Sequence, residues 1–383
     1  PYGAWVVREI QPAVGFVLNE KAYQITIKED GDVVEIKLEN RYIRGDIEGL
    51  KLDEDGNVIA GAKFGLFKSG TTEFTEENAL LVTETDSEGK FRFENIRFGK
   101  WIVRELVPAT GYVLNETPID VNIQTEGEII KISFENKFIR SNIRGYKVDE
   151  DGKPVEGALF GLFTEDETEF TEERAVLTAK SDAEGIFFFD DVRFGKWIVK
   201  ELAPAEGFVA NDTVFPIDVT TDGAVIEIKA ENRHIYGMVH TTKVDKDYPD
   251  NLLAGAIFEI YMDVDGNKEF DADIDTLVGE MVEYEPGLYE LENLRYGDYF
   301  LYEKQAPANY VKDDAYHYFA IVNDGEMVEV ENEAGIGFIN NHMVGNLKIV
   351  KSSSDGRLEG FSFRIIGENY DEIFKTERQS GSC

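Results

Sequence analysis

Cysteine is almost absent from this chain of 383 residues, since the only one is Cys383, the last residue. No disulfide can therefore form within one copy, and the cysteine content identifies no redox compartment. Histidine is also scarce, and the four residues (His234, His240, His317 and His342) show no metal-ligand spacing. No apolar run approaches the roughly 18 residues that span a bilayer, and no secretion signal is recognisable.

Positively charged residues are few, because 39 Lys and Arg stand against 76 Asp and Glu, which gives a net charge of −37 and a pI of about 4.4. This charge repels nucleic acids and anionic membrane surfaces, so we expect neither as a partner. A solvated acidic surface that keeps copies apart is favoured over a dedicated basic partner. Nucleophile elbows, phosphate-binding loops and Ser/His/Asp arrangements are missing too, so we expect no turnover enzyme.

What the sequence does contain is a repeat of domain size. Lys51, Lys147 and Lys243 lie 96 residues apart, and each follows an Asn by 11 residues, as Lys351 also does. With 42% hydrophobic and 12% aromatic residues, the chain can build packed cores. The period divides it into a C-terminal half-repeat (1–44), three full repeats (45–140, 141–236 and 237–343) and an N-terminal half-repeat (344–383).

The first full repeat has the pattern of short strands separated by turns rich in Gly and Asp. Glu73–Ala79 is its only plausible helical turn. About seven strands per repeat predict an all-β fold, an antiparallel β-sandwich of the Ig-like or prealbumin-like kind. Linkers are nearly absent, so we expect the tandem sandwiches to form a rod with limited bending. The strands are expected near 47–53, 62–67, 80–85, 90–96, 100–107, 118–124 and 129–136.

One segment rich in aromatic and β-branched residues recurs with a glutamate at its centre. It reads GKWIVRELVPATGY at 99–112. Because side chains alternate along a strand, Trp101, Val103 and Glu105 share one face. A carboxyl group is thereby placed among apolar side chains, where burying its charge is costly without a partner. The glutamates of the four copies are Glu9, Glu105, Glu201 and Glu303.

A lysine and an asparagine are also expected to point inward. Lys51 shares a strand face with Ile47, and Asn136 with Phe134. In the third full repeat Asn341 is a rival to Asn340, but it lies on the opposite face. The full repeats therefore hold three trios, namely Lys51, Glu105 and Asn136; Lys147, Glu201 and Asn232; and Lys243, Glu303 and Asn340. The half-repeats hold only parts of a trio, namely Glu9 with Asn40, and Lys351.

Three motifs surround the first trio: Lys-x-Asp followed by Gly-Ala-x-Phe, a Glu-x-x-Pro-x-x-Gly-Tyr box, and a terminal Phe-x-Asn. They are carried by Lys51, Asp53, Gly61, Ala62, Phe64, Glu105, Pro108, Gly111, Tyr112, Phe134 and Asn136. Together they resemble the Cna protein B-type, or SpaA-like, domains of Gram-positive surface proteins and pilins, over essentially the whole chain. In that family the Lys and Asn side chains join in an intramolecular isopeptide bond, with the Glu assisting. The resemblance implies three bonds: Lys51–Asn136, Lys147–Asn232 and Lys243–Asn340.

The residue types suit that chemistry. A lysine in a dry core has a lowered pKa and can act as a neutral amine, whereas a buried glutamate has a raised pKa and can stay protonated. The glutamate can then donate to the Asn carbonyl and shuttle a proton while ammonia leaves. No cofactor is needed, because folding supplies the effective molarity. The alternative is purely structural: a buried Lys–Glu pair capped by Asn, which would be a costly way to hold a core.

One loop of the third full repeat alternates oxygen-bearing residues in the manner of an EF-hand calcium loop. The calcium ligands that this pattern suggests are Asp263, Asp265, Asn267 and Asp271. The match is incomplete, because Ile274 occupies the twelfth position and Gly266 does not fall at the sixth. A solvated acidic loop is therefore favoured over a calcium site, and the histidines are interpreted as ordinary.

The family resemblance implies an extracellular stalk or spacer on the wall of a Gram-positive cell, which holds another domain away from the surface. Its partners would be neighbouring domains of the same protein. The alternative function is an adhesin region whose repeat loops bind a host protein or glycan. Near-identity of the first two full repeats favours the spacer, because recognition usually diversifies loops. A pilin shaft would need a Tyr-Pro-Lys type motif, and this sequence contains none.

Overall fold

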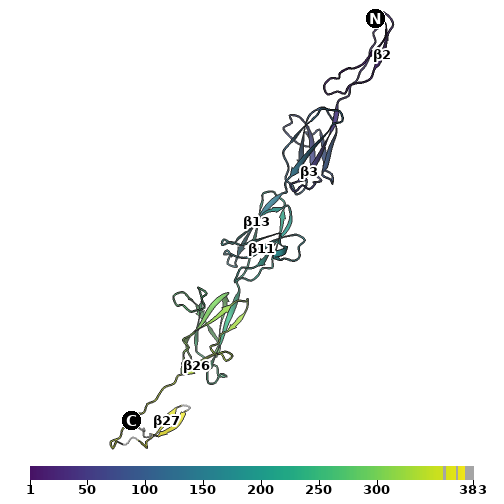
Figure 1. The fold of residues 1–383 in the computed structure, drawn as a ribbon. Helices are drawn as coiled ribbons and strands as arrows, with labels where there is room; N and C mark the ends of the chain where they lie inside the picture. The colour runs from purple at the N-terminus through teal and green to yellow at the C-terminus, as the bar shows by residue number, and fades with distance from the viewer. Residues whose placement is uncertain (357–358, 368–369, 376–383) are drawn as a thin grey trace, which may run out of the picture. The chain divides into compact units, whose positions relative to one another are not determined.

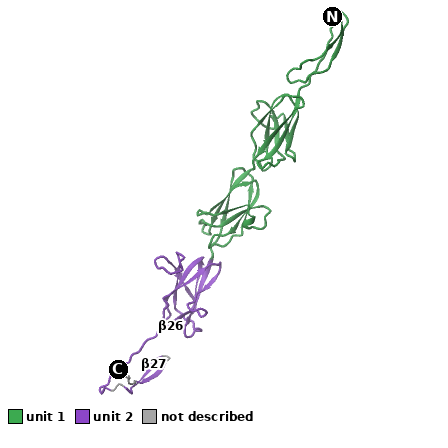
Figure 2. Cartoon of the chain, in the orientation of Figure 1, with its two compact units in different colours: residues 1–235 green, residues 236–383 purple. Residues whose placement is uncertain are grey.

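A computed structural model describes residues 1–356, 359–367 and 370–375, and Cys383 lies outside them. The chain divides into two compact units, residues 1–235 and 236–383 (Figure 2). The described residues form β-strands and one short 3-10 helix, η1 (Glu172–Arg174), without any α-helix (Figure 1). The all-β prediction is therefore confirmed. None of the described helices has the length and apolarity that would cross a membrane.

The first full repeat is a sandwich of two sheets, and its strands lie close to the predicted ranges. One sheet has the order β6-β3-β9 and the other the order β5-β4-β7-β8. The predicted helical turn at Glu73–Ala79 is a hydrogen-bonded turn, in which the N–H groups of Asn78 and Ala79 donate to Thr75 O. The strands are β3 (Arg44–Asp53), β4 (Lys63–Lys68), β5 (Leu81–Glu84), β6 (Lys90–Arg97), β7 (Gly99–Val107), β8 (Ile119–Ile123) and β9 (Ile129–Asn136).

The second full repeat has the same arrangement, with sheets β13-β10-β16 and β12-β11-β14-β15. Its helix η1 lies where the first full repeat has the turn after Glu73. The strands are β10 (Arg140–Val148), β11 (Leu159–Thr164), β12 (Leu177–Lys180), β13 (Ile186–Arg193), β14 (Gly195–Ala203), β15 (Val214–Val219) and β16 (Val225–Glu231).

The third full repeat keeps the sandwich but divides its last strand in two, because β25 and β26 both pair with β17. Its sheets have the orders β20-β21-β17-β26-β23 and β19-β18-β22-β24. The strands are β17 (Tyr236–Asp245), β18 (Ile257–Met262), β19 (Thr276–Glu280), β20 (Val282–Glu285), β21 (Leu288–Arg295), β22 (Gly297–Gln305), β23 (Tyr310–Val311), β24 (Tyr316–Ile321), β25 (Met327–Glu329) and β26 (Phe338–His342).

Each half-repeat forms one hairpin among its described residues. Strand β1 (Gly3–Val7) pairs with β2 (Tyr23–Ile27), and β27 (Ser362–Gly367) pairs with β28 (Tyr370–Lys375). Residues 33–40, which correspond in sequence to β9, have no strand assigned. A strand needs a neighbour for its backbone hydrogen bonds, and in the full repeats the first strand provides one.

The first and last strands of each full repeat are neighbours and run parallel. Strand β3 pairs with β9 so that Lys51 lies opposite Phe134 and Asp53 opposite Asn136. Strand β10 pairs with β16 in the same way, and β17 with β26. The predicted antiparallel sandwich did not include this parallel pairing of the first and last strands. It places two residues that are far apart in sequence on adjacent strands, with their side chains on the inward face.

The core of each sandwich is rich in aromatic rings. In the first full repeat Phe64 stacks on Phe91 with ring centroids 4.1 Å apart. The Phe91 ring lies directly over Gly49 of β3, where an added Cβ would be only 2.0 Å from the ring. Gly145 and Phe187 repeat this arrangement in the second full repeat, at 1.9 Å. These glycines therefore leave the space that the ring fills.

Inside the first unit, two ion pairs link the turn after β3 in the first sandwich to β10 and β13 of the second. Arg140, which the sequence period assigned to the first full repeat, is the first residue of β10. Arg193 Nη1 lies 2.7 Å from Asp55 Oδ2, and Arg140 Nη1 lies 2.8 Å from Glu54 Oε1. The Arg193 guanidinium also lies 4.5 Å from the ring centre of Phe138. These contacts connect the two sandwiches directly, without a flexible linker. The rod itself and the exact repeat boundaries stay predictions.

Candidate functional site

The first trio lies in the centre of the first full repeat. Lys51 on β3 and Asn136 on β9 belong to one sheet, whereas Glu105 on β7 reaches them from the facing sheet. The exposed fractions of the three residues are 0%, 1% and 1%. Every second residue is buried toward the C-terminal ends of β3 and β9, and this alternation places Lys51 and Asn136 on the inward face. The structure thus brings together the three residues that the sequence selected.

The contacts of the first trio link all three side chains. Lys51 Nζ donates to Asn136 Oδ1, and Asn136 Nδ2 donates to Glu105 Oε1 at 2.9 Å. Lys51 Nζ and Glu105 Oε1 are 3.7 Å apart. We expected the glutamate to contact the Asn carbonyl oxygen, but the amide nitrogen faces it instead. The Asn136 amide nitrogen therefore lies next to the Glu105 carboxyl, and the Asn136 carbonyl oxygen faces the Lys51 amine.

The second trio has the same composition and burial. Lys147 Nζ lies 3.4 Å from Glu201 Oε1, and Asn232 Nδ2 donates to both Glu201 oxygens at 3.0 Å. Lys147 Nζ and Asn232 Oδ1 are buried and form no hydrogen bond with any described residue. Orphaned polar atoms of this kind are costly in a protein core. A covalent bond between the Lys147 and Asn232 side chains would remove the cost of burying the Lys147 amine without a hydrogen bond.

The third trio is assembled in a diverged sandwich. Lys243 Nζ lies 3.1 Å from Glu303 Oε1 and donates to Phe338 O at 3.2 Å. Asn340 Nδ2 donates to Glu303 Oε1 at 2.9 Å, while Asn340 Oδ1 forms no hydrogen bond with any described residue. Asn341, the rival acceptor, is exposed. The structure therefore brings Asn340 and not Asn341 into contact with Glu303.

Burial changes the acid–base behaviour of the three lysines in the same direction. Desolvation lowers the pKa of Lys51 to about 8, against the opposing charge of Glu105. Desolvation likewise lowers the pKa of Lys147, and it lowers the pKa of Lys243 to about 8 against the charge of Glu303. A lowered amine pKa increases the neutral, nucleophilic fraction at physiological pH.

The half-repeats contain incomplete trios. Asn40 Nδ2 donates to Glu9 Oε1 at 2.9 Å and to Oε2 at 2.8 Å, although no lysine of the described residues joins them. Lys351 is exposed, and its Nζ lies 4.7 Å from the ring centre of Phe361. Glu9 and Asn40 thus make the Glu–Asn contact of the full repeats without a lysine among the described residues beside them.

Sequence reasoning missed one residue beside each glutamate. The backbone N–H ten residues after the glutamate donates to Glu Oε2 in all four copies, at 2.7 to 2.8 Å. The constant spacing was visible in the sequence as a repeated Asn or Asp. The residues are Asn19, Asn115, Asn211 and Asp313.

The predicted calcium ligands are only partly gathered. One carboxylate oxygen from each of Asp263, Asp265 and Asp275 lies within 4.8 Å of the others. The loop uses these carboxylates internally, because Asp263 accepts the N–H groups of Gly266 and Lys268 at 2.8 and 2.9 Å. Asp271, which the sequence pattern included, is not in this group of carboxylates, so calcium binding stays a prediction.

Two histidines lie beside carboxylates that the sequence did not connect with them. His234 groups with Asp149 and Glu150, and His342 groups with Asp245 and Asp247. Their spacing in the sequence gave no signal, because the carboxylates lie at or just after the end of the first strand of the repeat, and the histidines lie at or just after the end of its last strand. His342 Nε2 lies 2.9 Å from Asp245 Oδ2.

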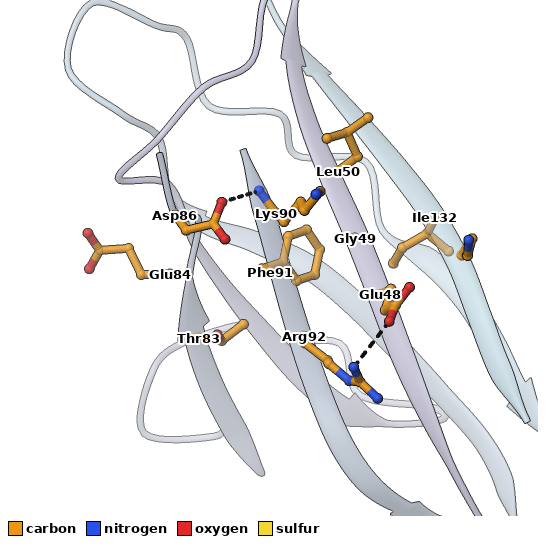
Figure 3. A pocket seen from close by; sticks show the side chains of 11 residues that line it. Glu48, Gly49, Leu50, Thr83, Glu84, Asp86, Lys90, Phe91, Arg92 and Ile132 are labelled. Carbon is orange, nitrogen blue, oxygen red and sulfur yellow. Dashed lines mark hydrogen bonds and ion pairs between the residues drawn. The ribbon is translucent and has the colours of Figure 1, made fainter. Parts of the chain in front are cut away.

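A surface pocket of 710 Å³ lies on the first full repeat beside β3, β5 and β6 (Figure 3). Its lining carries charges of both signs. Arg92 Nη1 lies 3.2 Å from Glu48 Oε1, and the backbone N–H of Lys90 donates to Asp86 Oδ1 at 2.9 Å. The pocket does not include any member of the trio.

Comparison with known proteins connects these features to a family. The SpaA prealbumin-like fold domain matches the chain three times, over residues 45–138, 141–234 and 237–334. No curated protein sequence matches the chain. The structure of the Bacillus anthracis TIE protein is similar, with a TM-score of 0.62 and 24% identity, over 82% of this chain and 54% of that one. The chain thus spans about half the length of that structure, and the likeness concerns the fold.

Two pilin structures are more distant. A streptococcal ancillary pilin has a TM-score of 0.29 and 20% identity, over 78% of this chain and 99% of that one. The major pilin subunit BcpA of Bacillus cereus has a TM-score of 0.37 and 16% identity, over 78% of this chain and 100% of that one. The family match covers most of the chain, and it confirms the resemblance drawn from the motifs. The chain belongs to the SpaA prealbumin-like fold domain family, with three copies of the domain.

Proposed function

We propose that each full repeat closes an amide bond between its lysine and its asparagine. The observation that carries the proposal is the buried trio, which recurs with the same Asn-to-Glu contact in all three full repeats. The third full repeat is the strongest support, because it has diverged but keeps the trio. It has Tyr299 and Asn309 at the positions that correspond to Trp101 and Gly111 of the first full repeat. The bonds are Lys51–Asn136, Lys147–Asn232 and Lys243–Asn340.

The reaction needs no component beyond the trio. The neutral amine of Lys51 attacks Asn136 Cγ, so that a bond forms between Nζ and Cγ while the bond from Cγ to Nδ2 breaks. One proton moves from Nζ to Nδ2, and ammonia leaves. Glu105 contacts both nitrogens and can give a proton to Nδ2 while it takes one from Nζ, so it ends unchanged. Each domain reacts once, which makes this an autocatalytic modification and not enzyme turnover.

Intact-mass measurement tests the proposal directly. We expect the purified chain to be lighter than its sequence mass by three molecules of ammonia. Tryptic mapping should recover three branched peptides that join the segments around Lys51, Lys147 and Lys243 to their Asn partners. A Lys51→Arg variant should be short of only two ammonias. A chain at its full sequence mass would show that the trio is only a buried polar cluster.

At the scale of the protein, we propose that the chain is part of a stalk or spacer on the surface of a Gram-positive cell. Family membership supports this role, as do the pilins among the similar structures. The near-identity of the first two full repeats also suits a spacer. Its partners would then be neighbouring domains of the same protein, and its location would be extracellular.

A host-binding adhesin region is the second candidate. The specific feature in its favour is the third repeat, whose loop places Phe270 on Tyr316 with ring centroids 3.6 Å apart, an arrangement that Phe74 and Phe170 do not make in the other full repeats. Glycan-array screening of the full chain separates the two functions. Specific binding that a Phe270→Ala variant loses would favour the adhesin, and absence of binding would favour the spacer.

A further inference from the structure

The residue ten positions after each glutamate contacts two parts of the trio region. In the first full repeat the Asn115 N–H donates to Glu105 Oε2 at 2.8 Å. The Asn115 side chain donates through Nδ2 to Glu135 O at 2.9 Å. Glu135 directly precedes Asn136 in the chain. Asn115 therefore connects the carboxyl of Glu105 to the backbone beside the reacting asparagine.

The second full repeat builds the same connection. The Asn211 N–H donates to Glu201 Oε2 at 2.8 Å, and Asn211 Nδ2 donates to Glu231 O at 2.6 Å. Glu231 precedes Asn232. In both repeats the amide oxygen of the connecting Asn accepts the N–H two residues later, that of Thr117 or Thr213. The connecting side chain thus has a fixed orientation.

The third full repeat makes the connection with two residues. Asp313 replaces the Asn, and its carboxylate has no hydrogen to donate to the last strand. Asn332 compensates, since its Nδ2 donates to Asp313 Oδ2 at 2.8 Å and to Ile339 O at 3.0 Å. Asn332 Oδ1 also accepts the Ile339 N–H at 2.7 Å. Ile339 precedes Asn340, so the link reaches the same point of the strand by another route.

The opening half-repeat shows that the connection does not depend on lysine. The Asn19 N–H donates to Glu9 Oε2 at 2.7 Å, and Asn19 Nδ2 donates to Glu39 O at 3.1 Å. Glu39 precedes Asn40, and no described lysine reaches this pair. The arrangement therefore exists without the amine, as pre-organisation for a reaction requires.

In the first full repeat the two oxygens of the Glu105 carboxyl have different partners. In the first trio Oε2 is held by the Asn115 N–H, while Oε1 faces Asn136 Nδ2 at 2.9 Å and Lys51 Nζ at 3.7 Å. Fixing one oxygen fixes the rotation of the carboxyl, so the other oxygen stays aimed at the two nitrogens between which a proton must move. A substitution at Asn115 keeps the backbone N–H that contacts Glu105. The position of this N–H depends on the hydrogen bond from the Asn115 side chain to Glu135 O in the last strand.

We propose that Asn115, Asn211 and the Asp313–Asn332 pair are positioning residues for amide formation, because they hold the glutamate carboxyl in register with the reacting asparagine. This inference rests on the proposed bond-forming function. The residues touch neither reacting nitrogen, so they act through the glutamate and through the strand that carries the asparagine.

The first experiment measures the rate of bond closure in the full chain during timed cell-free synthesis. Denaturing quenches and peptide mapping quantify each of the three branched peptides separately. We expect Asn115→Ala to slow formation of the Lys51–Asn136 bond on the order of 10- to 100-fold. Misplacement of a reacting group by about 1 Å can lower a reaction rate by up to about 100-fold. The second and third repeats serve as internal controls. Asn78→Ala, in an exposed turn of the first repeat, is the matched control and should close at the normal rate.

The second experiment is a rescue in the third repeat. Asn332→Ala should slow closure of the Lys243–Asn340 bond, because Asp313 alone cannot donate to Ile339 O. The double variant Asp313→Asn/Asn332→Ala should recover the rate, because an amide at 313 can donate to Ile339 O as Asn115 does to Glu135 O. A side chain that only supported the fold would show no such exchange between the two positions.

The outcomes separate this inference from the function on which it rests. If the wild-type chain forms no branched peptide, the proposed function fails and the positioning role fails with it. If the wild-type chain forms all three and the Asn115→Ala and Asn332→Ala variants close at the same rate, only the positioning role fails. If Asn332→Ala is slow and the double variant remains equally slow, the link to Ile339 O is not the cause, and the positioning role is again overturned.

Discussion

Lys51 has no exposed surface, and this burial supports the proposal that the trio forms a covalent bond. Burial of an ammonium group is costly, and a neighbouring carboxylate rarely compensates in full. Desolvation lowers the pKa of Lys51 to about 8, because burial disfavours the charged form of the amine. Amide formation removes the charge permanently. The buried lysine is therefore better explained by the bond it can form than by the pair it makes.

Replacement of Glu105 tests the catalytic role at the residue scale. We expect Glu105→Gln to leave Lys51 and Asn136 unlinked, so the variant should be two ammonias lighter than its own sequence mass, whereas wild type should be three ammonias lighter than its own. Without the cross-link over 85 residues, the first full repeat should lose about 4–5 kcal/mol of unfolding free energy by the chain-entropy relation for closed loops. Mass spectrometry and urea denaturation check the two effects. The exposed Glu116→Gln is the control, and an equal loss there would contradict the assignment.

The unlinked lysine should also make stability depend on pH. In Asn136→Ala, Lys51 stays buried with a pKa of about 8, whereas an unfolded lysine has the ordinary value of 10.5. Between these values the folded state has released a proton that the unfolded state still holds, so stability should rise as pH increases from about 8 to 10.5. Denaturation at several pH values measures the trend. The double variant Lys51→Met/Asn136→Ala should lack it, and the same slope in both would rule out Lys51 as the source.

At the scale of elements, strand β3 shows how the core admits its aromatic rings. Gly49 has no side chain, and the Phe91 ring occupies the vacant space while it stacks on Phe64. The third full repeat solves the same problem differently, with Thr241 at this position and Tyr289 in place of the Phe. The Thr241 hydroxyl donates to Val330 O at 2.7 Å. The strand and the ring opposite it have therefore changed together.

A methyl group at Gly49 should be poorly tolerated. Gly49→Ala places Cβ 2.0 Å from the Phe91 ring, and the ring cannot withdraw because Phe64 stacks on it. We expect a loss of roughly 1–3 kcal/mol, the usual cost of overpacking a core. Thermal melting compares it with Gly279→Ala, where the nearest atom to the new Cβ is 3.8 Å away. If both variants melted like wild type, the packing argument for Gly49 would be wrong.

The sequence predicted much of the fold and of the trio because both depend on local alternation. The inward faces of Lys51, Glu105 and Asn136 followed from period two, and the turns followed from Gly and Asp. The parallel pairing of β3 with β9 was missed, since pairing partners far apart in sequence leave no local pattern. The orientation of the Asn136 amide was missed for the same reason, because it depends on β3, β7 and β9 meeting. The contact of Asn115 with Glu105 was missed because it depends on how the loop after β7 folds back onto that strand.

At the scale of the whole molecule, three internal links should change how the denatured chain migrates. We expect wild type to run faster in a denaturing gel than the variant Lys51→Ala/Lys147→Ala/Lys243→Ala, because three closed loops make the denatured chain more compact. Reductant should not change the mobility of either monomer, since a single cysteine cannot form a disulfide within one chain. Each single Lys→Ala variant should migrate between the two. Identical mobility of all the variants would be inconsistent with internal cross-links.

The parallel pairing of the first and last strands also determines how a full repeat would respond to tension. A pull on the two ends enters β3 at Arg44 and leaves β9 after Asn136, so it acts along both strands in opposite directions. Their interstrand hydrogen bonds are then loaded together in shear and not opened one by one. With the proposed amide closed, force crosses from Lys51 to Asn136, and residues 52–135 carry none of it. The sandwich between these points could unfold and refold without the repeat becoming longer.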